Sequence, residues 1–331
     1  MSGPPQPSKG MPSPDARWTL TDWAQAIHEL KVAQDAAILA HWYHGEELAT
    51  VADVVGDTLR LLQAATALPH QTLVVAATVF VAESVKILYP ERRVLVPDPL
   101  AGCSLAESCP PELFARLRET YPDALAVVHI QSSAELKALS DIVVTTGTAE
   151  LVVRTLPEDR LLLFAPDHEL GDFLRQRTGR RILSWFGACV VHTSFSSETL
   201  QRWRQLYPAA PVLASPQCPP DIRQQATVLG SSQQLLDYVA RQRPAQLILA
   251  SDHGLAFQLR KLLPAESQLL LLPAEDSCHC THCPYMRLNT LPKLYNCLLT
   301  GAPEVQLPDE LLRRARPPLE RLLQLVPPSG K

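Results

Sequence analysis

The amino-acid sequence predicts an α/β protein of three homologous domains, each an αβα sandwich with a parallel sheet, in a pseudo-threefold arrangement. Three observations predict this fold class. The chain has 331 residues, more than one ordinary hydrophobic core accommodates. Short continuous apolar runs alternate with amphipathic helical patterns, which is typical of parallel sheets covered on both faces. Several elements also recur at a spacing of 86 to 88 residues, which chance rarely produces.

The first recurring element is a β-rich run that ends in a polar residue, a spacer and a second polar residue. From His41 to His129 the spacing is 88 residues, and from His129 to Ser215 it is 86. The three polar pairs are His41 with Tyr43, His129 with Gln131, and Ser215 with Gln217.

The second recurring element ends in a hydroxyl residue just before a helical pattern. These residues are Thr58, Thr146 and Ser232, again 88 and 86 residues apart. Buried strands are then expected at 73–76, 161–164 and 247–250. The last strand of each repeat is expected at 94–96, 181–185 and 269–272. Functional loops of open α/β sheets follow the carboxyl ends of strands, so the polar residues are expected to converge on one central cavity.

Each last strand leads into a loop that contains a cysteine: Cys103, Cys189 and Cys283. The first two are 86 residues apart and the third lies 94 further on, so the third loop is longer. Three thiolates hold a 4Fe–4S cluster with one iron left open, and one cysteine per repeat suits such a cluster on a threefold axis. The alternative is that the cysteines are small buried apolar residues. A second alternative is a zinc site at 278–283, where Cys278 and Cys280 alternate with histidines.

The repeats set the expected domain boundaries. Residues 1–17 are rich in Pro, Ser and Gly and are expected to be a disordered tail. The three α/β repeats are expected at 18–112, 113–199 and 200–300, followed by a C-terminal helical extension at 301–331. Thr21 is the expected N-cap of the first helix, and 311–325 is the expected packing helix of the extension.

Composition and charge limit the function classes. A net charge of −4 argues against a general nucleic-acid binder. No apolar run reaches the length of a membrane span, and the N-terminus has no secretory pattern. A cytoplasmic location is therefore expected. In that reducing compartment eight cysteines indicate metal or redox chemistry.

At this point several motifs resemble the quinolinate synthase family (quinolinate synthase A). The cysteine motifs are AGCSL at 101–105, GACVVH at 187–192 and CPYMRLNTL at 283–291. Further matching segments are AHWY at 40–43, FVAE at 80–83, Pro166-Asp167, Gly230-Ser231-Ser232 and the final helix from Pro317. The resemblance covers nearly the whole chain after the tail. It implies three α/β domains around a central 4Fe–4S cluster held by Cys103, Cys189 and Cys283.

The resemblance also implies an activity and partners. The family condenses iminoaspartate with dihydroxyacetone phosphate to quinolinate, in de novo NAD synthesis, with loss of two waters and phosphate. An aspartate-oxidising enzyme is the expected partner, with no nucleic acid and no membrane. The predicted catalytic residues are Tyr43 (a proton donor), His129, His192 and Gln217. The predicted substrate-binding residues are His41, Thr58, Gln131, Thr146, Ser215 and Ser232.

The sequence departs from the family pattern in the pocket. His129 and Gln131 stand where the family usually has Tyr and Asn, and Ser215 and Gln217 where it has His and Glu. An amide cannot act as a general base, so His168 or His253 is a candidate substitute. Three functions stay open: a quinolinate synthase, a divergent paralogue acting on another small oxo-, imino- or hydroxy-acid, and a non-catalytic cluster protein.

Overall fold

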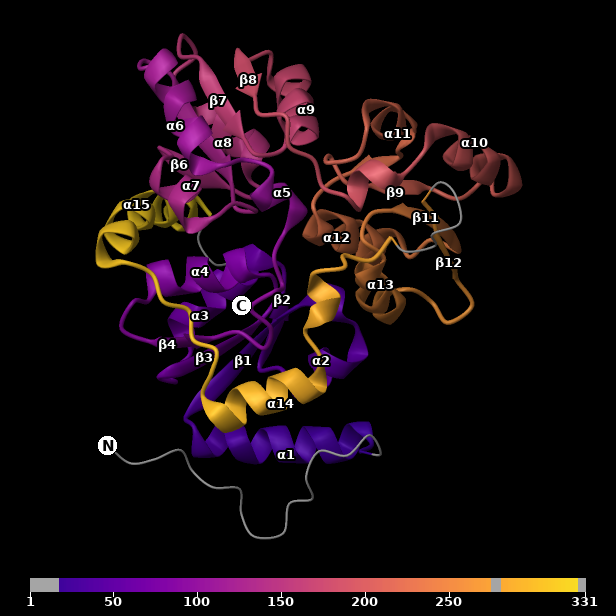
Figure 1. The fold of residues 1–331 in the computed structure, drawn as a ribbon. Helices are drawn as coiled ribbons and strands as arrows, with labels where there is room; N and C mark the ends of the chain where they lie inside the picture. The colour runs from indigo at the N-terminus through magenta and orange to yellow at the C-terminus, as the bar shows by residue number, and fades with distance from the viewer. Residues whose placement is uncertain (1–17, 275–280, 327–331) are drawn as a thin grey trace.

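The computed structural model describes residues 18–274 and 281–326 and contains three four-stranded, all-parallel sheets (Figure 1). Their strand orders are β2-β1-β3-β4, β6-β5-β7-β8 and β10-β9-β11-β12, which is one topology used three times. The strand register repeats as well: Ala40, Val128 and Ala214 pair with Ala76, Ala165 and Ala250. The predicted fold class, three homologous α/β units with parallel sheets, is confirmed.

The first unit shows why its strands are continuously apolar. Successive residues of β1 face opposite sides of the sheet, and both sides are buried. Ala37 and Leu39 join one hydrophobic core, whereas Ile38 and Ala40 join a second core on the other face. The elements of this unit are α1 (Leu20–Ala33), β1 (Ala36–His41), η1 (Trp42–His44), α2 (Glu46–Val51), β2 (Val54–Gly56), α3 (Thr58–Ala67), β3 (Thr72–Ala76), α4 (Val79–Leu88), β4 (Arg93–Leu95) and α5 (Ser104–Glu107).

The second and third units repeat this plan. The second contains α6 (Pro111–Thr120), β5 (Leu125–His129), α7 (Ala134–Ala138), β6 (Ile142–Val144), α8 (Ala149–Thr155), β7 (Leu162–Ala165), α9 (His168–Thr178), β8 (Ile182–Ser184) and η2 (His192–Ser194). The third contains α10 (Ser197–Leu206), β9 (Val212–Ala214), α11 (Pro220–Gln225), β10 (Val228–Leu229), α12 (Ser232–Gln242), β11 (Gln246–Ala250), η3 (His253–Leu255), α13 (Ala256–Leu262), β12 (Gln268–Leu271) and η4 (Met286–Leu288).

The C-terminal helices return to the first two units. Helix α14 (Leu291–Thr300) packs along α1, where Leu294 and Leu298 share a core with Ile27 (Figure 1). Helix α15 (Asp309–Leu325) packs against α4 and α7 and so joins the first unit to the second. The predicted packing helix at 311–325 is confirmed. The boundaries of 18–112, 113–199, 200–300 and 301–331 stay a prediction.

Some local expectations change. The N-cap of α1 is Thr19, not Thr21, because Thr19 and Asp22 form a reciprocal capping box two residues earlier. No helix in the described ranges has the length and apolar character to cross a membrane. The expected disordered tail at 1–17, and Cys278 and Cys280 of the zinc alternative, lie outside the described residues.

Candidate functional site

One pocket collects polar residues from all three units, at the carboxyl ends of their strands. All ten residues predicted to be catalytic or substrate-binding line it. They are His41, Tyr43, Thr58, His129, Gln131, Thr146, His192, Ser215, Gln217 and Ser232. Nine of them are the three recurring positions of the three repeats, and His192 is the tenth. The threefold repeat therefore builds a single site to which every unit contributes.

The first recurring position forms the same turn in each unit. His41 Nδ1 accepts a hydrogen bond from the Tyr43 backbone N–H at 3.3 Å, and His129 Nδ1 accepts one from Gln131 N–H at 3.4 Å. In the third unit, Ser215 Oγ accepts from Gln217 N–H at 3.2 Å. The Ser215 hydroxyl thus keeps the turn that a histidine makes in the other two units.

These turns assign the tautomers of His41 and His129. Because Nδ1 accepts a hydrogen bond in both rings, the hydrogen of the neutral imidazole lies on Nε2. His129 Nε2 donates to Thr146 Oγ1 at 3.1 Å. Burial lowers the pKa of His41 and of His129 to about 3. Both rings are therefore neutral hydrogen-bond donors at neutral pH.

Tyr43 and the second recurring position supply hydroxyl groups. The Tyr43 hydroxyl lies 2.7 Å from Ser232 Oγ, and burial raises its pKa well above the usual value, so the phenol stays protonated. Thr58 and Ser232 are the first residues of α3 and α12, and Asp57 and Ser231 cap these helices. In the second unit Thr146 precedes α8, whose N-cap position is occupied by Thr148.

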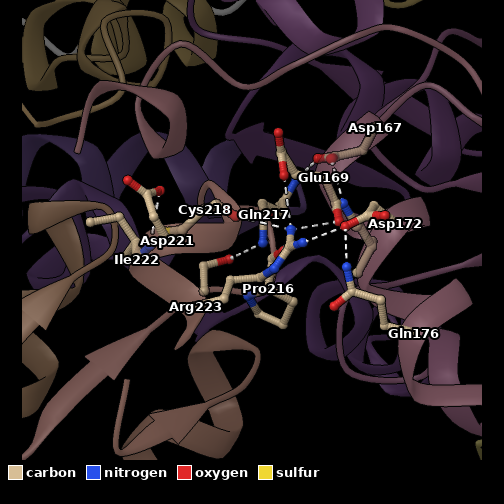
Figure 2. Close-up of polar contacts among 12 residues, drawn as sticks. Asp167, Glu169, Asp172, Gln176, Pro216, Gln217, Cys218, Asp221, Ile222 and Arg223 are labelled. Carbon is tan, nitrogen blue, oxygen red and sulfur yellow. Dashed lines mark hydrogen bonds and ion pairs between the residues drawn. The ribbon is translucent and has the colours of Figure 1, made fainter. Parts of the chain in front are cut away.

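Gln217 contacts the second unit through its side-chain amide (Figure 2). Its Nε2 donates to Gln131 Oε1 at 2.9 Å and to Asp167 Oδ2 at 2.5 Å. Asp167 is 1% exposed, and burial raises its pKa. The second oxygen of Asp167 accepts from the Leu170 N–H and caps α9. The buried side chain of Asp167 is therefore in direct contact with Gln217.

The three predicted cluster cysteines each begin a helical turn. The Cys103 carbonyl accepts the N–H of Glu107 at 2.9 Å, that of Cys189 accepts Thr193 N–H at 3.0 Å, and that of Cys283 accepts Arg287 N–H at 3.3 Å. The backbone N–H groups of the residues two and three positions further on interact with each sulfur and act to lower its pKa. These donors are Leu105 and Ala106, Val191 and His192, and Tyr285 and Met286.

This arrangement favours thiolates, because N–H groups at the start of a helical turn stabilise negative charge. Burial opposes it and raises the pKa of Cys103 and Cys283 to about 12 and that of Cys189 to about 11. The thiols are close enough for Cys189 and Cys283 to raise the pKa of Cys103 further. Across 18–274 and 281–326, no three His, Cys, Asp or Glu side chains are placed to hold a single metal ion. A cluster of four irons is larger than one ion and requires sulfurs further apart.

His192 joins the cysteine loop to the pocket. It lies three residues after Cys189, is 4% exposed, and its Nε2 lies 3.4 Å from Ser251 Oγ. Its buried Nδ1 has no hydrogen-bond partner among the described residues. Buried polar atoms are almost always hydrogen-bonded, so an unpaired one in a pocket wall marks a position for a ligand.

The sequence analysis assigned no site role to Ser251, which lines the pocket, or to Asp167, which contacts Gln217. Both follow the third strand of their repeat, and the register makes Asp167 equivalent to Asp252 and Ser251 equivalent to Pro166. Polar residues at that strand end were the available signal. The two candidate substitute bases are not in the pocket lining. His168 stacks on Phe186, and His253 donates from Nε2 to the Leu272 carbonyl at 2.9 Å.

The fold and the pocket define a class: an enzyme of three α/β units with one shared site between them. The sequence profile of a family described as "Quinolinate synthetase A protein" matches residues 25–324. The chain is 42% identical over 299 residues to a quinolinate synthase of Cyanophora paradoxa, covering 90% of this chain and 91% of that protein. It is 40% identical over 307 residues to one of Chloroherpeton thalassium, covering 92% and 94%. The chain belongs to the quinolinate synthetase A family.

Proposed function

We propose that this chain synthesises quinolinate from iminoaspartate and dihydroxyacetone phosphate, with release of two waters and phosphate. The observation that carries the proposal is the convergence of nine repeat-equivalent polar residues on one pocket, in a chain that belongs to this family. The residues that differ from the family pattern still line that pocket and are hydrogen-bonded within it, as Ser215 and His129 illustrate.

Neutral hydrogen-bond donors bind the two anionic substrates. The pocket lining contains no lysine or arginine among the described residues. The N-termini of α3 and α12 open into it at Thr58 and Ser232, and such helix ends bind carboxylate and phosphate groups. The Nε2–H group of neutral His41 adds a donor that does not depend on pH in the neutral range, whereas His129 donates its Nε2–H to Thr146.

Proton transfer falls to Tyr43. Its hydroxyl is protonated at neutral pH and hydrogen-bonded to Ser232, so it can donate a proton to a leaving hydroxyl and recover one through Ser232. Exclusion of water by the buried walls, including Phe80 and Met286, would protect a hydrolysable imine.

Cys103, Cys189 and Cys283 are the proposed ligands of a 4Fe–4S cluster. Their fit rests on three equivalent helical turns, on N–H groups aimed at each sulfur, and on the unpaired Nδ1 of neighbouring His192. When bound, a cluster with one open iron supplies a Lewis acid that polarises substrate oxygens. A reducing compartment and an enzyme that oxidises aspartate to iminoaspartate belong to the same proposal.

The test is anaerobic. The purified chain is reconstituted with iron and sulfide, both are quantified, and quinolinate is measured after addition of iminoaspartate and dihydroxyacetone phosphate. Quinolinate formation that requires both substrates supports the proposal. A chain with a full cluster and no product would contradict it and would direct attention to another small oxo-, imino- or hydroxy-acid.

A further inference from the structure

The orientation of the Gln217 amide is set by the hydrogen bond that it donates to Asp167. A primary amide has two N–H hydrogens, and Gln217 uses both, one toward Asp167 and one toward Gln131. Both oxygens of Asp167 accept hydrogen bonds, Oδ1 from the Leu170 N–H and Oδ2 from Gln217, so the nitrogen of Gln217 lies on the Asp167 side. The carbonyl oxygen of Gln217 is then the polar atom that remains for a ligand.

The same contact orients a second amide. Gln131 uses its oxygen to accept from Gln217, so the two hydrogens on Gln131 Nε2 remain for a ligand. Asp167 thus determines the direction of hydrogen bonding through two side chains. An acceptor on Gln217 and a donor on Gln131 come to lie beside each other in the pocket lining.

Asp167 cannot move to suit another orientation. Its Oδ1 is held at 2.8 Å by the Leu170 N–H, as the cap of α9. The loop that carries Gln217 is held to the same helix by Arg223, which donates to the carbonyls of Pro216 and Cys218 and also to Glu169 and Asp172 (Figure 2). The two partners are therefore fixed by contacts independent of their own hydrogen bond.

We propose that Asp167 is a positioning residue that orients the amide pair Gln217–Gln131, and that this pair selects a substrate with a hydroxyl or amino hydrogen next to a carboxylate. Gln131 donates to the carboxylate, and Gln217 accepts the neighbouring O–H or N–H. Iminoaspartate belongs to this class in its enamine form, so the substrate assignment rests on the proposed function. The orientation of the amide pair does not.

A glutamine at position 217 suits this role better than a glutamate. Two carboxylates in contact must share a proton, so the orientation would depend on the protonation state of the pair. The Gln217 amide carries its hydrogens permanently. The departure from the family pattern at position 217 is thereby matched to the hydrogen-bond acceptor that Asp167 presents.

The orientation is tested without any substrate. The full chain is labelled with ¹⁵N-glutamine, and the Gln217 side-chain signal is assigned by its absence in Gln217→Met. Asp167→Asn keeps the α9 cap, since Asn caps as well as Asp, but no longer fixes the amide. We expect the Gln217 amide hydrogens to exchange with solvent about 10- to 100-fold faster, as for loss of a charged hydrogen bond. Asp57→Asn, a cap of the first unit, should leave them unchanged. Unchanged exchange in Asp167→Asn would overturn the proposal.

Selectivity is tested by calorimetric titration of L-malate and succinate, two dicarboxylates that differ by one hydroxyl. We expect the wild-type chain to bind L-malate at least about tenfold more tightly, and the ratio to approach one in Asp167→Asn. The two acids have the same charge, so any change of charge at position 167 cancels in the ratio. If wild type and Asp167→Asn showed the same ratio of L-malate to succinate affinity, the proposed selectivity would be refuted. If this ratio falls to about one in Asp167→Asn but the wild-type chain makes no quinolinate, only the proposed function is refuted.

Discussion

Arg223 joins the second and third units through a buried ion-pair network, and its removal gives a measurable prediction. Its side chain is 4% exposed and pairs with Glu169 Oε2 at 2.9 Å and Asp172 Oδ2 at 2.7 Å. It also donates to the Glu169, Pro216 and Cys218 carbonyls. Arg223→Met leaves two largely buried carboxylates without this cation. Breaking a buried pair in this way costs about 3–5 kcal/mol.

The lower end of that range is expected here, because Asp172 keeps Arg175 as a partner at 2.5 Å. The assay is urea unfolding followed by far-UV circular dichroism at pH 7, and the predicted loss is about 3 kcal/mol. Arg175→Met is the matched control. It removes the other cation of the same carboxylate, but Arg175 is 59% exposed, so its loss should cost under about 1 kcal/mol. Equal losses in the two variants would refute the argument that burial decides the energy.

Three further predictions concern the pocket and the cysteines. Cys103→Ala should abolish iron binding after reconstitution, whereas Cys109→Ala, also buried, should retain it; iron content is the measurement. Tyr43→Phe should lower kcat by about 10²–10⁴-fold with little change in KM, whereas Thr58→Ala should raise KM more than it lowers kcat; steady-state kinetics separate the two. His129 has a folded-state pKa of about 3, below the ordinary 6.5, so its contribution to stability is lost as pH falls below about 6.5. Below pH 6.5 this loss is about 1.4 kcal/mol per pH unit. Between pH 7 and 5 the unfolding free energy of wild type should therefore fall by about 2 kcal/mol more than that of His129→Gln.

The sequence by itself determined the three-unit fold and the residues around the pocket. Parallel strands buried on both faces are continuously apolar, so β1, β5 and β9 can be found from composition alone. The carboxyl ends of such strands meet at one edge of a sheet, so His41, His129 and Ser215 could be assigned to a common site. Both inferences use periodicities and distances within one unit, which local chain geometry fixes.

Only the tertiary structure decided how the units meet. Asp167 and Gln217 are fifty residues apart and come from different units, and their contact depends on the angle at which α9 approaches the loop after β9. The packing of α14 on α1, rather than on the third sheet, is likewise a contact between segments far apart in the sequence. Contacts between units come from the packing of complete surfaces, and no local periodicity of the chain encodes that packing. The role of Gln217, an amide oriented by a buried carboxylate, was therefore visible only once the units were assembled.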